Sequence, residues 1–182
     1  MKRVALAFTA IMLFACGALA DEGHHHEDLT ENQLGTVHFP VSCAATVLKP
    51  FERGVALLHS FWYEEAEKEF EQIAKDDPQC AMAHWGIAMS IWHQLWNKPD
   101  AATVKRGQVE VKRAKSLHPK TDRERDYIAA MDAFYRGNRR DYQDRANTYS
   151  KAMGTAYQRY PDDRFDQRVR GRVVRLGPVP AR

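Results

Sequence analysis

The sequence predicts an all-α protein, an array of about three helical hairpins stacked as an α-α solenoid. Apolar residues recur at i, i+3 and i+4, and no stretch alternates with a period of two strongly enough to indicate a strand. Prolines suited to ending the second helix of a hairpin stand at positions 78, 119 and 161, which are 41 and 42 residues apart. A chain of 182 residues with 44% apolar residues can also bury a core, which excludes a disordered or collagen-like protein.

The first 20 residues have the organisation of a secretory signal peptide. Lys2 and Arg3 form a positive start, residues 4–15 are apolar, and Ala18 and Ala20 supply small residues before a cleavage site. The uncharged stretch has only 17 residues, which is short for a membrane span. We therefore expect an exported protein, periplasmic or secreted, that begins at Asp21.

The cysteines allow two further interpretations of this exported protein. Cys16 follows a sequence similar to a lipobox, so a lipid anchor at Cys16 is the alternative to a soluble form, although Phe14 fits that pattern poorly. Cys43 and Cys80 remain after cleavage. We expect them to form a disulfide, because the compartment is oxidising and each stands near the start of a first helix in neighbouring hairpins. No Cys-x-x-Cys spacing favours zinc or haem, and no cofactor is expected.

Residues 21–41 are polar and then contain a proline, which predicts a mobile leader that packs only near residues 37–41. His24, His25 and His26 are adjacent in it. Neutral imidazole binds zinc, copper and nickel, so a periplasmic metal-binding or metal-delivery protein is the alternative function. Three adjacent histidines cannot enclose an ion by themselves, and a solvated leader is the simpler interpretation.

The repeat domain spans residues 42–163, and its first hairpin has the clearest pattern. Helices are predicted over 43–61 and 64–76. Gly54, Ala66, Phe70 and Pro78 follow one another at intervals of 12, 4 and 8 residues. These offsets resemble those of the tetratricopeptide repeat. Glycine and alanine allow two helices to approach closely, phenylalanine fills the space between them, and proline ends the second helix.

Four more helices complete the predicted array, over 79–95, 101–117, 122–136 and 141–160. They match the repeat more loosely, with extra length inside each unit. Ser42 is predicted to cap the first helix of the domain and Asp100 the fourth, and Thr121 with Glu124 forms a capping box for the fifth. The resemblance to the tetratricopeptide family therefore covers about 120 residues.

Residues 164–182 differ sharply in composition, with six arginines, no lysine and several helix-breaking glycines and prolines. We interpret them as a disordered basic tail or as a truncated or frame-shifted end. The positive net charge comes from the two chain ends, because residues 21–163 carry 19 basic and 23 acidic residues, a net charge of −4. No basic stripe remains for nucleic acid to bind.

Residues able to carry catalysis are not arranged in a known pattern, and the chain is not expected to be an enzyme. Among the histidines of the first helices, His59, His84 and His93 could converge, but single helical histidines are more often packing residues. The four tryptophans are interpreted as packing residues in the same way. The alternating glutamates of residues 64–71 are interpreted as a solvated face.

The family resemblance implies a non-catalytic scaffold that captures a peptide or protein on its concave face. In such an array the first helix of each hairpin lines that face. Aligning the units gives eight residues expected to face the groove, namely Phe51, Val55, His59, Ile87, Ser90, Tyr127, Met131 and Phe134. The partner itself is not indicated by the sequence.

Overall fold

The computed structural model describes residues 34–93, 98–137 and 141–161, and within those ranges it is helical and contains no strand. A short 3-10 turn, η1 (Ala45–Val47), leads into α2 (Leu48–His59). The helices that follow are α3 (Tyr63–Asp76), α4 (Ala81–Ser90), α5 (Ala101–Ser116), α6 (Asp122–Tyr135) and α7 (Tyr142–Arg159). None of the helices in the described ranges combines the length and apolar character that crossing a membrane requires.

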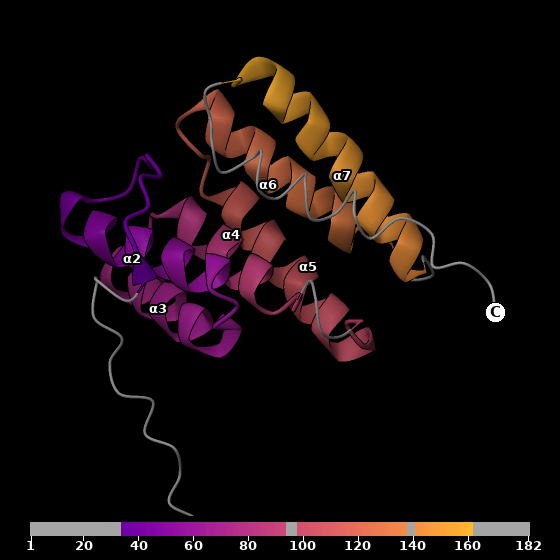
Figure 1. Cartoon of the computed structure of the whole chain (residues 1–182), viewed down its shortest axis with the longest axis horizontal. Coiled ribbons are helices and arrows are strands. Elements are labelled where there is room, and N and C mark those ends of the chain that lie inside the picture. Colours follow the sequence, from indigo (N-terminus) through magenta and orange to yellow (C-terminus); the bar gives the residue numbers. More distant parts are fainter. Residues whose placement is uncertain (1–33, 94–97, 138–140, 162–182) are drawn as a thin grey trace, which may run out of the picture.

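Each helix packs against the next one along the chain, from purple α2 to yellow α7 in Figure 1. In addition, α4 contacts both α2 and α6, so these three helices form a connected row. The predicted all-helical fold with sequential packing is confirmed. The amphipathic pattern locates the helices because the repeated apolar positions of α2, α3 and α6 are buried in one core.

Helix ends follow the predicted caps in α5 and α6. Asp100 accepts a hydrogen bond from the Thr103 amide at 2.7 Å. Thr121 and Glu124 bond each other's backbone amides at 3.2 Å, which completes the capping box. Both predicted caps are therefore confirmed.

The ends of α2 and α4 differ from the prediction. The helix expected over 43–61 ends at His59 because Phe61 adopts a left-handed φ of 66°, and the helix expected over 79–95 ends at Ser90 before His93, whose φ is 48°. Ser42 does not cap the first helix: η1 precedes α2, and Ser42 bonds Glu124 of α6 instead. Sequence periodicity continued past both ends, but the backbone turns there.

Phe70 packs directly against two glycines, as the repeat pattern predicts for Gly54. The Phe70 ring is fully buried between α2 and α4. A methyl group on Gly54 would lie 2.8 Å from Cζ of Phe70, and one on Gly86 would lie 2.3 Å from its Cδ1. Only the absence of a side chain at these positions lets the three helices close around the ring.

Two glycine-to-alanine substitutions should therefore change stability in opposite directions. Gly86→Ala is expected to lower the free energy of unfolding by about 1–3 kcal/mol, because its methyl group collides with a ring that cannot move aside. Gly154→Ala in α7 is expected to raise it by about 0.5–1 kcal/mol, since nothing lies within 4 Å of the new methyl group and alanine favours the helix. Urea unfolding of both variants checks this; a change of the same sign in both would contradict it.

The disulfide predicted between Cys43 and Cys80 is present, with Cα atoms 4.8 Å apart and the two residues 37 positions apart in sequence. Cys80 immediately precedes α4, and Cys43 lies two residues before η1 in the non-helical stretch that leads into it. The bond ties the N-terminal part of the described chain to the start of α4.

Candidate functional site

Residues 34–44, called here the N-terminal segment, are largely non-helical, and Phe39 inserts into the row of helices α2, α4 and α6. Phe39 is only 1% exposed. Its ring centroid lies 5.7 Å from that of Phe51 in α2, 5.4 Å from that of Trp85 in α4 and 5.4 Å from that of Tyr127 in α6. One side chain of the segment therefore contacts three helices, and the cavity it fills is called here the Phe39 pocket.

Arg123 of α6 closes the Phe39 pocket and also binds the backbone of the segment. Its guanidinium carbon lies 4.2 Å from the Phe39 ring centroid and 4.7 Å from that of Tyr127. Its Nη1 donates a hydrogen bond of 3.0 Å to the carbonyl of Pro40. A guanidinium that stacks on a ring and donates to a carbonyl recognises both the side chain and the main chain of a peptide.

Glu124 binds the segment three residues after Phe39. The Ser42 amide donates to Oε1 of Glu124 at 2.6 Å, and the Ser42 hydroxyl lies within hydrogen-bond distance of both carboxylate oxygens, at 2.8 and 2.6 Å. These residues are 82 positions apart in sequence. Glu124 as a whole is 1% exposed, so the bonds form away from bulk water, where they are strongest.

Acidic side chains hold two more backbone amides of the segment. Glu52 of α2 accepts a bond of 3.3 Å from the Phe39 amide and contacts the His38 ring at 3.1 Å. Asp77, which follows α3, accepts one of 2.7 Å from the amide of Ala44. Side chains from separate helices thus satisfy the main chain of a non-helical segment, as a protein does when it binds an extended peptide.

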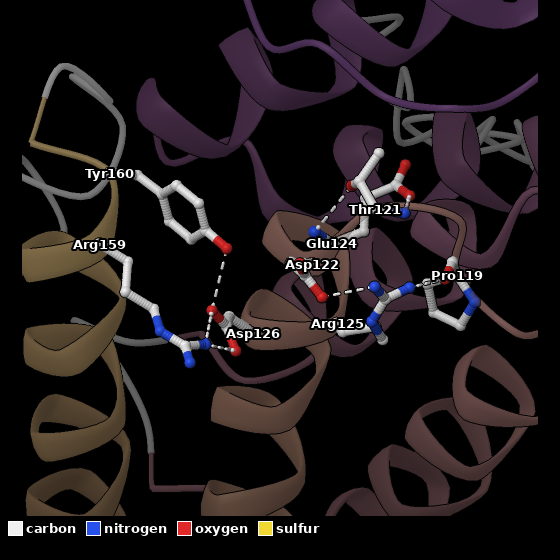
Figure 2. A network of polar contacts seen from close by, with 8 residues as sticks. All are labelled: Pro119, Thr121, Asp122, Glu124, Arg125, Asp126, Arg159 and Tyr160. Atoms are coloured by element: carbon white, nitrogen blue, oxygen red, sulfur yellow. Dashed lines mark hydrogen bonds and ion pairs between the residues drawn. The ribbon is translucent and has the colours of Figure 1, made fainter.

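The first turns of α6 are held in place by a polar network that Figure 2 shows. Arg125 bonds the carbonyl of Pro119 at 2.7 Å and the carboxylate of Asp122 at 2.5 Å. One turn further on, Asp126 accepts bonds from Arg159 at 2.8 Å and from the Tyr160 hydroxyl at 3.1 Å, which join α6 to the end of α7. Arg123 and Glu124 therefore project from a helix end whose position is fixed.

The pKa of Glu124 lies below its usual value of 4.5. Burial raises this pKa, but hydrogen bonds from Ser42 and Thr121 lower it by more. Because the pKa is lower in the folded protein than in the unfolded chain, the ionised carboxylate stabilises the fold above about pH 4.5, and that contribution disappears as the pH falls through the folded-state pKa.

Glu124→Gln should lower the free energy of unfolding by about 1.5–3 kcal/mol at pH 7, since hydrogen bonds to a charged acceptor are lost. The difference from the wild type should shrink on acidification, because the wild-type carboxylate is then protonated. Urea unfolding from pH 7 down to pH 2 checks this. Asp122→Asn is the control: the pKa of Asp122 is also lowered, by Arg125, but its side chain is 80% exposed and should contribute much less. A constant difference for Glu124→Gln at all pH values would contradict the assignment.

The eight residues expected to face the groove lie mostly in the core. Phe51, Val55, Ile87, Ser90, Tyr127, Met131 and Phe134 are at most 4% exposed, and only His59 is half-buried. In the described structure these seven side chains are therefore covered by other parts of the chain, and their expected contact with a partner stays a prediction. Phe51 and Tyr127 do line the Phe39 pocket, whereas Ser90 bonds the Gly86 carbonyl at 2.9 Å and Phe134 packs 3.9 Å from Trp92, centroid to centroid.

Two of the histidines and two of the tryptophans interpreted from the sequence as packing residues make contacts or are buried in the structure. His84 contacts Glu110 of α5 at 2.7 Å, and His93 stacks on Tyr63 with 5.2 Å between ring centroids. Trp85 and Trp92 are buried, as expected. Trp96 lies outside the described residues.

The glutamates of α3 are not merely a solvated face, which corrects the sequence interpretation. Glu67 and Glu71 contact Arg106 of α5 at 2.5 and 2.8 Å, and Glu69 contacts Arg53 of α2 at 2.5 Å. These ion pairs link α3 to α2 and to α5. The sequence showed the charges but not the partners across the helix interfaces.

Metal ligands gather at one place in the described part of the chain, where ligand atoms of Cys43, Asp77 and Cys80 lie within 4.8 Å of one another. Both sulfurs are used by the disulfide. His24, His25 and His26, the proposed cleavage site, Cys16 and the arginine-rich residues 164–182 all lie outside the described residues. The metal alternative therefore stays a hypothesis based on the sequence.

Comparison of the chain with protein families, with curated proteins and with solved structures gives no match in any of the three.

The sequence predicts packing near residues 37–41, but not the contacts that hold the N-terminal segment, which involve Phe39, Ser42, Arg123 and Glu124. One signal was present, since Phe39 and its neighbours form an apolar run at the end of an otherwise polar leader. Glu124 was recognised only as half of a capping box. Its second role depends on a residue 82 positions away, which local patterns do not report.

Proposed function

We propose that this chain is a non-catalytic scaffold of the tetratricopeptide type, exported to the cell envelope, that binds a peptide or protein partner where α2, α4 and α6 meet the N-terminal segment. The observation that carries the proposal is the burial of Phe39 between three helices while helix side chains bind the backbone on either side of it. These are the helices that the family resemblance selects as lining the concave face. In this proposal the segment occupies a surface that also receives a partner.

Two further observations support the proposal. The contacts combine a deep apolar pocket for one side chain with charged groups for the neighbouring amides and carbonyl, a division of roles that suits peptide recognition. The disulfide suits an oxidising compartment, where such bonds persist.

The experiment is a selection of displayed random peptides on the full-length mature protein with Phe39→Ala and Ser42→Ala, which empty the surface and leave the disulfide in place. Enrichment of related peptides is expected. Adding Arg123→Ala should abolish their binding, while Lys112→Ala, an exposed change on α5, should not. Failure to enrich any peptide on a variant that keeps wild-type helicity would overturn the proposal.

A further inference from the structure

The N-terminal segment indicates which peptides the proposed surface recognises, because each of its contacts selects for one chemical feature. The Phe39 pocket is built from three aromatic rings and the Arg123 guanidinium, and it encloses a planar ring on all sides. An aliphatic side chain would leave part of this volume empty and would lose the cation–π contact. The first feature is therefore an aromatic residue.

The second feature is a serine or threonine three positions later. Glu124 accepts from the amide of Ser42, which any residue supplies, and contacts the Ser42 hydroxyl with both oxygens, which only serine or threonine supplies. Alanine in that position would leave a buried carboxylate short of a donor, which is costly. A phosphate there would be repelled by the carboxylate.

The two positions between them are less restricted. Pro40 is exposed and contributes its carbonyl, which Arg123 binds at 3.0 Å. Val41 is half-buried against the core. A proline at the first of these positions fixes an extended backbone, which reduces the entropy lost on binding.

We infer that the surface lined by Phe51, Trp85, Tyr127, Arg123 and Glu124 binds partner proteins through an extended aromatic-x-x-Ser/Thr segment, and that residues 39–42 of this chain compete with it from within the same molecule. The inference rests on the proposed function and specifies its ligand. When a tethered segment occupies the site, an outside ligand can bind only during the fraction of time that the site is empty. The apparent affinity for that ligand is lowered accordingly. A partner must therefore bind strongly enough to displace the N-terminal segment.

The test uses a fluorescent peptide with the sequence of residues 36–42, Thr-Val-His-Phe-Pro-Val-Ser, which stops before the disulfide-held Cys43. Its binding to the full-length mature protein is measured by anisotropy. The Phe39→Ala, Ser42→Ala receptor should bind it at least about tenfold more tightly than the wild type, because the competing segment is weakened. Replacing the peptide's phenylalanine or serine by alanine should each weaken binding about tenfold or more, and phosphorylating the serine should abolish it.

Several outcomes would overturn the inference. Equal binding of the alanine peptides, or equal affinity of the two receptors, excludes the stated recognition. If the peptide selection succeeds but yields sequences without an aromatic-x-x-Ser/Thr pattern, the proposed function stands and this inference fails. A concentration-dependent dimer of the wild type, lost in the Phe39→Ala, Ser42→Ala variant, would assign the surface to a second copy of the chain instead of a partner.

A measurement on the wild-type protein covers the case in which the double variant does not fold. Excess peptide should speed hydrogen exchange at the amides of Phe39 and Ser42, since it displaces them from Glu52 and Glu124. The phosphorylated peptide should leave these rates unchanged. Unchanged rates with the unmodified peptide at saturating concentration would contradict displacement.

Discussion

Replacing both Cys43 and Cys80 by alanine is expected to lower the free energy of unfolding by about 4 kcal/mol. The bond joins residues 37 positions apart. A disulfide that closes a loop of that length lowers the entropy of the unfolded chain, which corresponds to about 4 kcal/mol at 25 °C. The loss is a large share of the 5–15 kcal/mol (roughly) that stabilises an ordinary domain. Urea unfolding of the oxidised wild type and the double variant measures it.

The single variants test whether the effect belongs to the bond. Cys43→Ala and Cys80→Ala each break the same link, so each should cost nearly as much as the double change. Cys80 is buried and Cys43 is half-buried, so loss of packing alone would make the two single variants unequal and their effects additive. Additive effects would show that the disulfide contributes little.

The disulfide also bears on the proposed function. Cys43 directly follows Ser42, whose hydroxyl contacts the Glu124 carboxylate, so the bond keeps the N-terminal segment near the Phe39 pocket. A short tether gives the segment a high effective concentration there. In the oxidised protein, a partner peptide would therefore compete with a ligand that cannot diffuse away.

The helices could be predicted from the sequence because their causes are local. The spacing of apolar residues locates α2 and α3, and the side chains of Asp100 and Thr121 mark the starts of α5 and α6. The disulfide could also be predicted, since the cleavage expected after Ala20 leaves only Cys43 and Cys80, each near the start of a predicted helix. The residues that determine each helix lie within a few positions of one another. The two remaining cysteines can pair in only one way.

The candidate site could not be predicted in the same way. Phe51 and Tyr127 were expected from the repeat alignment to face a groove, but helical periodicity does not say whether a neighbouring helix, a partner or the chain's own N-terminal segment covers them. The structure places Phe39 there, and Phe39 comes from a leader for which the sequence predicts packing near residues 37–41 but not the surface it packs against. The position of the segment depends on contacts with residues up to 82 positions away.

Phe70→Ala is expected to cost about 3–5 kcal/mol, because a fully buried ring is removed and the helices around it cannot close the cavity. Gly54 and Gly86 face the ring and have no side chains that could move into the space, and Phe51 packs on its edge with centroids 5.3 Å apart. Phe70→Leu should cost less, since it keeps most of the volume. Phe61→Ala, at a half-buried ring, is a matched control that should cost less than Phe70→Ala.

A double-mutant cycle gives the sharper test, because Gly86→Ala should change sign in the Phe70→Ala background. In the wild type the new methyl group would lie 2.3 Å from the ring, whereas without the ring it enters the cavity and fills part of it. Alanine also favours the helical conformation of α4 by about 1 kcal/mol over glycine. Gly86→Ala should therefore stabilise the Phe70→Ala protein in urea unfolding. If its effect is equally destabilising in both backgrounds, the close approach of α4 to the Phe70 ring is not the reason that position 86 requires glycine.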